Sequence, residues 1–168
     1  MKTFRFALGS PSRLASVALA SLGLSAAPSL QAADIYLTTN GDFGAPGNGW
    51  ESGGAPVAGN NYFSVGFRVV TPNANSNQTF AGDSLTLSAN GSNVGAVLEI
   101  RQGFFATIVN DLRINNSFVR NTTGFNPALQ GNVTVTGFAS FNPTLGRNLR
   151  ITAVVGGTGE VRARAGVV

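Results

Sequence analysis

Apolar and polar residues alternate in four short segments of the chain, and this alternation predicts β-strands. The segments are residues 84–88, 111–115, 132–136 and 148–152. Successive side chains of a strand point to opposite faces, so one face of each segment can be buried while the other meets water. Beyond the first thirty-odd residues no stretch repeats its apolar positions with the period of a helix. The pattern therefore predicts an all-β fold.

The spacing of these segments indicates how the strands stack. Their central residues follow one another at intervals of 27, 21 and 17 positions. These residues are Thr86, Arg113, Thr134 and Ile151. A parallel β-helix repeats its coil at intervals of about this length, and loops on one side absorb the irregularity. We therefore predict a short right-handed parallel β-helix, a β-solenoid, over residues 62–168. The alternative is an antiparallel β-sandwich or jelly roll, because some turn signals fit hairpins.

The alternation also predicts which side chains face the core. Burial of one large apolar side chain contributes roughly 1.5–3 kcal/mol. A slip of one residue would expose the whole set, so the alternation fixes the strand register. The predicted core residues are Leu85, Leu87, Leu98, Ile100, Ile108, Leu112, Ile114, Val133, Val135, Leu149 and Ile151.

Residues 1–32 have the pattern of a secretory signal peptide. Lys2, Arg5 and Arg13 form a positively charged start, residues 14–24 are apolar, and small residues follow. The apolar stretch is nearer to the length of a signal peptide than to the ~20 residues of a membrane-spanning helix. No later stretch is long enough to span a membrane. We expect an exported protein that is extracellular, periplasmic or attached to the cell surface.

Removal of this leader changes the charge of the chain. The full chain has 11 Lys and Arg against 7 Asp and Glu. Three of the cations belong to the leader, which leaves a net charge of +1 and no basic run. The remainder therefore does not predict nucleic-acid binding. The chain has no His and no Cys, so Ser–His catalysis and Cys nucleophiles are excluded. No pattern indicates a cofactor.

Residues 33–61 are rich in Gly, Asn and Pro, and they predict a capping loop at the N-terminal end. The run from Gly41 to Trp50 consists of turn formers around Phe43 and Trp50. Such a loop is ordered only when its aromatic side chains find apolar surface. We expect it to cover the first coil, because an uncapped end exposes strand edges and core.

Four segments resemble a known family. Residues 50–62, WESGGAPVAGNNY, resemble a W-x-x-G-x-x-P-x-A-G-N-D-Y opening, and residues 67–72, FRVVTP, resemble the strand end L-R-T-P. Residues 79–87, TFAGDSLTL, resemble F-x-G-D-S-L-x-L, and residues 149–159, LRITAVVGGTG, resemble L-x-I-x-A-x-I-x-G-x-G. The chain is thus similar to the β-solenoid head of large exported bacterial proteins with autotransporter-associated β-strand repeats, of the planctomycete and verrucomicrobial type.

This resemblance covers most of residues 48–160. The leader, the solenoid pattern and the scarcity of catalytic residue types predict a non-enzymatic structural or surface-adhesion module. Asn61 stands where the pattern has Asp, and the chain stops at Val168, where such proteins continue through further coils. We therefore expect a truncated member with an open edge at residues 160–165, which Arg162 and Arg164 protect in part. The expected partners are cell-surface polysaccharide or neighbouring β-solenoid coils.

A polysaccharide lyase or hydrolase is the enzymatic alternative. Such a site needs paired carboxylates, or a carboxylate with a basic partner, in one cleft. Asp83 and Asp111 both lie where strands begin, and Arg113 shares the strand face of Asp111, so stacked coils could bring the three together. Arg101 shares a face with Glu99 in the same way. In the other interpretation, which we favour, Asp83 begins a turn while Asp111 and Arg113 lie on the outer face.

Aromatic residues offer a third interpretation, a carbohydrate-binding module. Trp50, Tyr62 and Phe43 would be its ligand-binding residues if their rings formed an exposed strip. Aromatic residues stacked inside a solenoid are more often core, and we favour that assignment. A calcium site would need several oxygen donors in one loop. Neither Asp42 nor Asp83 lies in a loop of known calcium-binding spacing, so no metal site is predicted.

Overall fold

The computed structural model describes residues 31–44, 49–143 and 147–164. Nearly all of the predicted signal peptide lies outside these ranges. Within them the chain forms 14 strands and no helix, which agrees with the predicted all-β class. No helix that could cross a membrane occurs in the described part of the chain.

The strands form two sheets in which every neighbouring pair is parallel. This pairing does not fit the antiparallel sandwich. The first sheet has the order β1 (Ala33–Tyr36), β3 (Asn60–Val65), β6 (Ser84–Ser88), β8 (Ala106–Asn115), β10 (Ala128–Val135) and β12 (Arg150–Ile151), with β5 (Gln78–Thr79) beside β8 and β13 (Val154–Gly157) beside β10. The second has the order β14 (Glu160–Ala163), β11 (Phe138–Pro143), β9 (Ser117–Asn121), β7 (Val97–Ile100), β4 (Arg68–Val70) and β2 (Gly41–Asp42).

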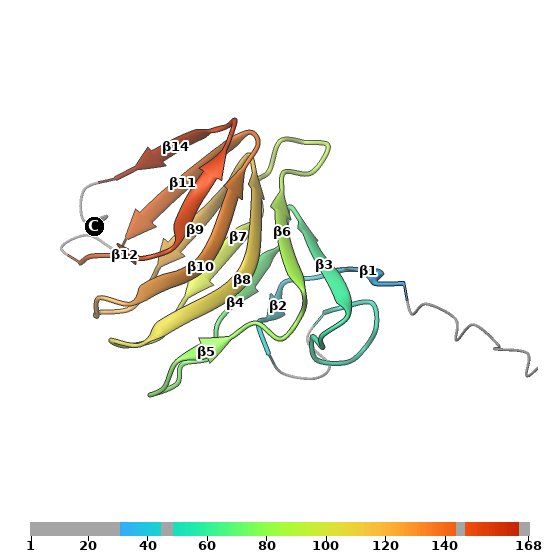
Figure 1. Ribbon diagram of the computed structural model, residues 1–168, viewed down its shortest axis with the longest axis horizontal. Coiled ribbons are helices and arrows are strands. Elements are labelled where there is room, and N and C mark those ends of the chain that lie inside the picture. Colours follow the sequence, from blue (N-terminus) through green and yellow to red (C-terminus); the bar gives the residue numbers. More distant parts are fainter. Residues whose placement is uncertain (1–30, 45–48, 144–146, 165–168) are drawn as a thin grey trace, which may run out of the picture.

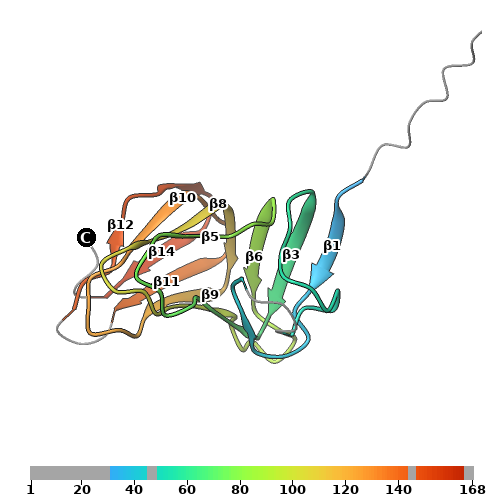
Figure 2. The ribbon, with the colours of Figure 1, turned by 90° about the horizontal axis from the view of Figure 1, so that it is seen from below.

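The chain visits the two sheets in turn and advances along the long axis of the molecule. Figure 1 shows this advance as a change of colour from blue at β1 to red at β14, and Figure 2 shows the same order from below. In the second sheet Phe118 lies beside Ser140, and Phe138 lies beside Glu160. In both pairs the second residue follows the first by 22 positions in the chain. Each pass thus adds one strand beside the preceding one.

Two of the three spacings found in the sequence join residues that lie side by side on neighbouring strands. Thr86 lies beside Arg113, and Arg113 lies beside Thr134. The third was wrong, because Thr134 lies beside Gly156, whereas Ile151 lies five positions earlier in the register, beside Leu129. The reason is the length of β10, whose first part pairs with β12 and whose second part pairs with β13.

A β-bulge in β8 explains the one predicted core residue that was misplaced. Asn110 is an extra residue between two aligned parts of the strand. Thr107 and Val109 are buried before the bulge and Leu112 is buried after it, whereas Ile108 is only half-buried. An extra residue shifts the alternation by one position, so a single alternating pattern could not describe both halves of β8.

The other predicted core residues are buried, apart from Ile151, which is half-buried and packs against the core. Four aromatic side chains fill the N-terminal end of this core: Phe43, Trp50, Tyr62 and Phe80. Their rings lie 5.0–6.3 Å apart. Tyr62 has no exposed surface, so this end of the molecule is packed around it.

The segment predicted as an N-terminal capping loop is in fact partly strand. β1 and β2 extend the two sheets by pairing with β3 and β4, so the boundary expected at residue 62 does not separate loop from sheet. The part around Trp50 does cover the edge of β1. Trp50 forms an antiparallel bridge with Leu37. The Tyr36 amide donates to the Glu51 carboxylate at 2.9 Å, and the Glu51 amide donates to the Tyr36 carbonyl at 2.9 Å.

The other end of the sheets is open over the described residues. β13 and β14 each pair with one strand, β10 and β11 respectively, and all their residues are exposed. Val154, Val155 and Val161 are among the exposed large apolar residues. This geometry agrees with the open edge expected for residues 160–165, of which residue 165 lies outside the described ranges. Arg162 pairs with Glu160 at 2.8 Å.

Candidate functional site

The three candidate catalytic residues do not form one cluster. Asp111 and Arg113 are joined by an ion pair of 2.6 Å on the outer face of the first sheet. The Asp83 carboxylate instead accepts a hydrogen bond from the Gly59 amide at 2.8 Å. No ion pair or side-chain hydrogen bond joins Asp83 to this pair among the described residues. These contacts fit a turn residue and an outer-face ion pair.

The three candidate sugar-binding aromatics lie in the core. Trp50, Tyr62 and Phe43 are at most 3% exposed. The Trp50 and Tyr62 rings meet edge to face at 5.0 Å, and the Trp50 indole donates to the Asp42 carbonyl at 3.3 Å. Buried rings cannot form an exposed strip, so these residues have a packing role.

Every Asp and Glu side chain is engaged in a contact within the protein. Four accept hydrogen bonds from amide groups, and three pair with arginine. The amide contacts are Asp34 with Asn61, Asp42 with Gly44, Glu51 with Tyr36 and Asp83 with Gly59, and the arginine pairs are Glu99 with Arg68 and Arg101, Asp111 with Arg113, and Glu160 with Arg162. No group of three or more acidic side chains that could hold a metal ion occurs in the part of the chain that the structure describes.

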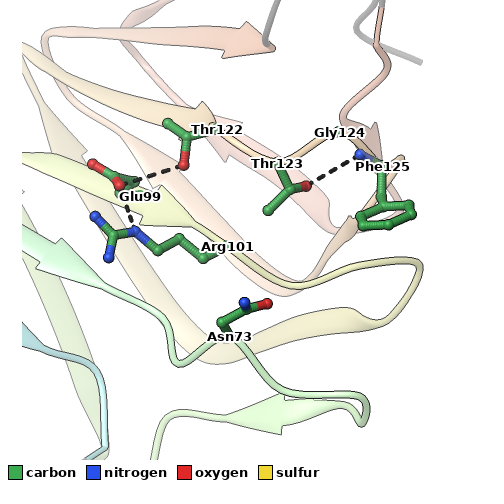
Figure 3. A pocket seen from close by; sticks show the side chains of 7 residues that line it. All are labelled: Asn73, Glu99, Arg101, Thr122, Thr123, Gly124 and Phe125. Carbon is green, nitrogen blue, oxygen red and sulfur yellow. Dashed lines mark hydrogen bonds and ion pairs between the residues drawn. The ribbon is translucent and has the colours of Figure 1, made fainter.

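The most deeply buried of these carboxylates belongs to Glu99 on β7. The residue is 6% exposed, although strand alternation turns it away from the core, where Leu98 points. Arg68 donates to it at 3.0 Å, and Arg101 donates at 2.7 Å. The Thr122 hydroxyl completes the group with a hydrogen bond of 3.3 Å. Figure 3 shows the contacts of Arg101 and Thr122. We call Glu99, Arg68, Arg101 and Thr122 the Glu99 cluster.

The two arginines keep the buried carboxylate ionised. Burial by itself raises the pKa of Glu99, but the hydrogen bond from Arg101 and the positive charges of both arginines outweigh it. The pKa of Glu99 therefore lies below its ordinary value of 4.5. The ionised carboxylate in turn orients both guanidinium groups, which are about half exposed.

We expect Glu99→Gln to lower the free energy of unfolding at pH 7 by roughly 1–3 kcal/mol, because charge-assisted hydrogen bonds are lost. The pKa of Glu99 is lower in the folded state than in the unfolded state, so the ionised carboxylate stabilises the fold above about pH 4.5. This stabilisation is lost as the pH falls through the folded-state pKa. Urea unfolding of both proteins at pH 7 and pH 3 should show the difference shrinking at the lower pH.

Asp111→Asn is the control for this measurement, since its ion pair with Arg113 is exposed to solvent. Exposed pairs contribute about 0–1 kcal/mol, so this variant should unfold close to the wild type at both pH values. A loss in Glu99→Gln that stays the same at pH 3 would contradict the assigned role of the ionised carboxylate.

A hollow of about 520 Å³ opens beside the Glu99 cluster. Its lining residues are Asn73, Glu99, Arg101, Thr122, Thr123, Gly124 and Phe125. A neighbouring hollow of about 240 Å³ shares Arg101 and is also lined by Arg68 and Asp42. Arg101 thus borders both hollows, and Arg68 borders the smaller one.

Asn121 fixes the loop that forms one wall of this hollow. Its amide donates to the Phe125 carbonyl at 2.9 Å, and its carbonyl oxygen accepts from the amide and hydroxyl of Thr123. The other side is fixed through the backbone of Arg101, whose amide donates to the Thr71 hydroxyl at 2.9 Å. Buried side chains therefore hold both walls in place.

An exposed pair of phenylalanines lies at the rim of the hollow. Phe125 is 47% exposed and Phe104 is 69% exposed. Their ring centroids are 5.0 Å apart, with an angle of 62° between the rings. Large apolar side chains are usually buried. Exposed aromatic side chains that lie together beside polar groups are typical of binding surfaces.

Only part of the Glu99 cluster can be predicted from the sequence. The alternation places Arg101 on the same face as Glu99, two positions away, but Arg68 is 31 positions from Glu99. Their contact depends on the register between β4 and β7, where Val70 lies beside Glu99. No local signal in the sequence gives that register.

Comparison of the chain with protein-family models, curated proteins and solved structures finds no match. The resemblance to proteins with autotransporter-associated β-strand repeats therefore stays a prediction from the sequence.

Proposed function

We propose that the protein is an exported, non-enzymatic β-solenoid module with a structural or adhesive role in the bacterial cell envelope or at the cell surface. The engagement of all Asp and Glu side chains in structural contacts is the observation that carries this proposal. Hydrolases and lyases of polysaccharides need a carboxylate or other base that is free to exchange a proton with the substrate. Here the acidic groups are used to fix turns, edges and arginines.

The strand arrangement supports the solenoid part of the proposal. Strands that successive passes add to the same sheet pair in parallel, and the later passes repeat every 22 positions. Connections between parallel strands of one sheet are almost always right-handed, which favours a right-handed parallel β-helix. The open edge formed by β13 and β14 is where a neighbouring β-solenoid coil would add, since its backbone groups and valines are exposed.

Export and the absence of catalysis can be measured together on the full chain. We expect a bacterial host to deliver it outside the cytoplasm with residues 1–32 removed, as N-terminal sequencing of the recovered protein would show. Incubation of this protein with neutral and acidic polysaccharides should release neither new reducing ends nor unsaturated sugars. Leu19→Arg, which interrupts the apolar part of the leader, is the matched control and should block processing.

Two outcomes would contradict this proposal. Retention of the wild-type chain in the cytoplasm with an intact leader would refute export. Steady release of sugar fragments, lost in Asp111→Asn or Asp83→Asn, would instead support the polysaccharide-active alternative.

A carbohydrate-binding role is the second candidate, and the exposed pair of Phe104 and Phe125 beside the hollow favours it. Aromatic side chains pack against the apolar C–H faces of sugar rings, while hydroxyl, amide and guanidinium groups bind the sugar oxygens. The residues at this rim differ from Trp50, Tyr62 and Phe43, whose burial argues for packing.

A further inference from the structure

The guanidinium groups of the Glu99 cluster have donors to spare. Glu99 takes the Nη1 hydrogen of Arg68 and the Nε hydrogen of Arg101, whereas each guanidinium carries five N–H groups. Neither guanidinium makes a further hydrogen bond to the described residues. Both side chains are about half exposed, at 44% and 45%. The buried carboxylate thus holds two half-exposed cations whose remaining N–H groups make no hydrogen bond to the described residues.

Further arginines make this surface locally positive. Arg120 is exposed and lies beside Glu99 in the register of β7 and β9. The Nη2 atom of Arg147 lies 4.0 Å from the position that a Cβ atom would take on Gly124, which lines the hollow. Arg68, Arg101 and Arg120 thus lie around Glu99, and Arg147 approaches the far wall of the hollow. The sequence beyond the leader has a net charge of only +1, so this concentration belongs to one face.

The same face carries groups suited to sugars. Asn73 lines the hollow with an amide, and Figure 3 shows the Phe125 ring on the side opposite Glu99. An arginine cluster alone would bind many anions. The combination with an exposed aromatic pair points to a ligand that has both acidic groups and apolar ring faces.

We infer that this face binds an acidic polysaccharide. Arg68 and Arg101 take the carboxylate or sulfate of one sugar residue, since guanidinium groups bind such oxyanions in paired, charge-assisted hydrogen bonds. Phe125 and Phe104 pack against a neighbouring sugar ring, and Arg120 and Arg147 add attraction along the chain. This inference rests on the proposed adhesive function and names its ligand class.

The test is calorimetric titration of the exported chain with polygalacturonate, dextran sulfate and neutral dextran as probes. We expect binding to one or both acidic polymers and none to dextran, with affinity that falls as salt rises. Polygalacturonate and dextran sulfate distinguish a carboxylate ligand from a sulfate ligand. Arg101→Gln should weaken binding about tenfold or more, because it removes a charged hydrogen-bond donor.

Arg113→Gln is the matched control. Arg113 is likewise a half-exposed arginine paired with a carboxylate, but it lies on the first sheet, so its loss should leave affinity within about twofold of the wild type. Because Arg101→Gln also affects Glu99, the variants Arg120→Gln and Arg147→Gln are measured as well. Neither side chain makes an ion pair or hydrogen bond with Glu99 in the described residues, so each should weaken binding without lowering the unfolding midpoint.

Several results would overturn the inference. They are absence of binding to both acidic polymers, equal binding to dextran, or equal loss of affinity in Arg113→Gln. Tighter binding of a DNA duplex than of either polysaccharide at the same salt concentration would assign the face to nucleic acid instead. If no acidic polysaccharide binds but the chain is still exported and releases no sugar fragments, the proposed function stands without this ligand. Failure of export, or release of sugar fragments, refutes the proposed function directly.

Discussion

Replacement of Gly131 by Ala is expected to lower the free energy of unfolding by about 3 kcal/mol or more. Gly131 has φ +111°, a conformation that costs other residues of order 1–3 kcal/mol. A Cβ atom at this position would lie 1.9 Å from the carbonyl oxygen of Val109, far inside van der Waals contact. The clash occurs at the bulge between β8 and β10, so relief would require the two strands to move apart. Urea unfolding followed by circular dichroism measures the loss.

Gly156→Ala is the control, because Gly156 also lies in a strand of the first sheet. Its Cβ atom would meet no heavy atom within 4 Å, and its φ is not among the positive values. We expect a change within about 1 kcal/mol, since Ala at a compatible position restricts the unfolded chain. If both alanine variants unfolded at the same urea concentration as the wild type, the bulge would not have the described geometry.

Replacement of Trp50 by Ala is expected to lower the free energy of unfolding by roughly 3–5 kcal/mol, the range for buried aromatic residues. The side chain is 3% exposed and contacts Tyr62 and Phe80. Its removal would leave a cavity at the end of the core and weaken the cover over β1. Thermal unfolding by scanning calorimetry measures the effect.

This variant also separates two roles of the aromatic residues. If Trp50 packs the core, Trp50→Ala loses stability and keeps affinity for acidic polysaccharide in the fraction that stays folded. Phe104→Ala should do the reverse, because Phe104 is 69% exposed. If Trp50→Ala kept the wild-type unfolding temperature but lost polysaccharide binding, Trp50 would be a ligand-binding residue and not a core residue.

Strand spacing was predicted well where one strand pairs with one neighbour. The intervals from Thr86 to Arg113 and from Arg113 to Thr134 are registers of the first sheet. The spacing to Ile151 is not a register, because β10 is long enough to pair with two strands in succession. Alternation marks a strand, but it carries no information about which part of a longer neighbour that strand meets.

The candidate site was predicted less well than the fold. Alternation placed Arg101 on the face of Glu99, and it placed Asp111 with Arg113. It gave no reason to prefer the first pair over the second. The difference lies in burial, since Glu99 is contacted by residues from two other segments, Arg68 and Thr122. Burial of a polar residue on an outer face depends on loops that fold over it.

The sequence by itself determined the all-β class, most of the core and the two spacings that proved to be registers. These follow from alternation, which is a local property because side chains of a strand point to opposite faces in turn. Only the tertiary structure decided the bulge at Asn110, the strand character of residues 33–36 and the meeting of Arg68 with Glu99. Each of these depends on the alignment of segments more than twenty positions apart, and that alignment is set by packing of the whole stack.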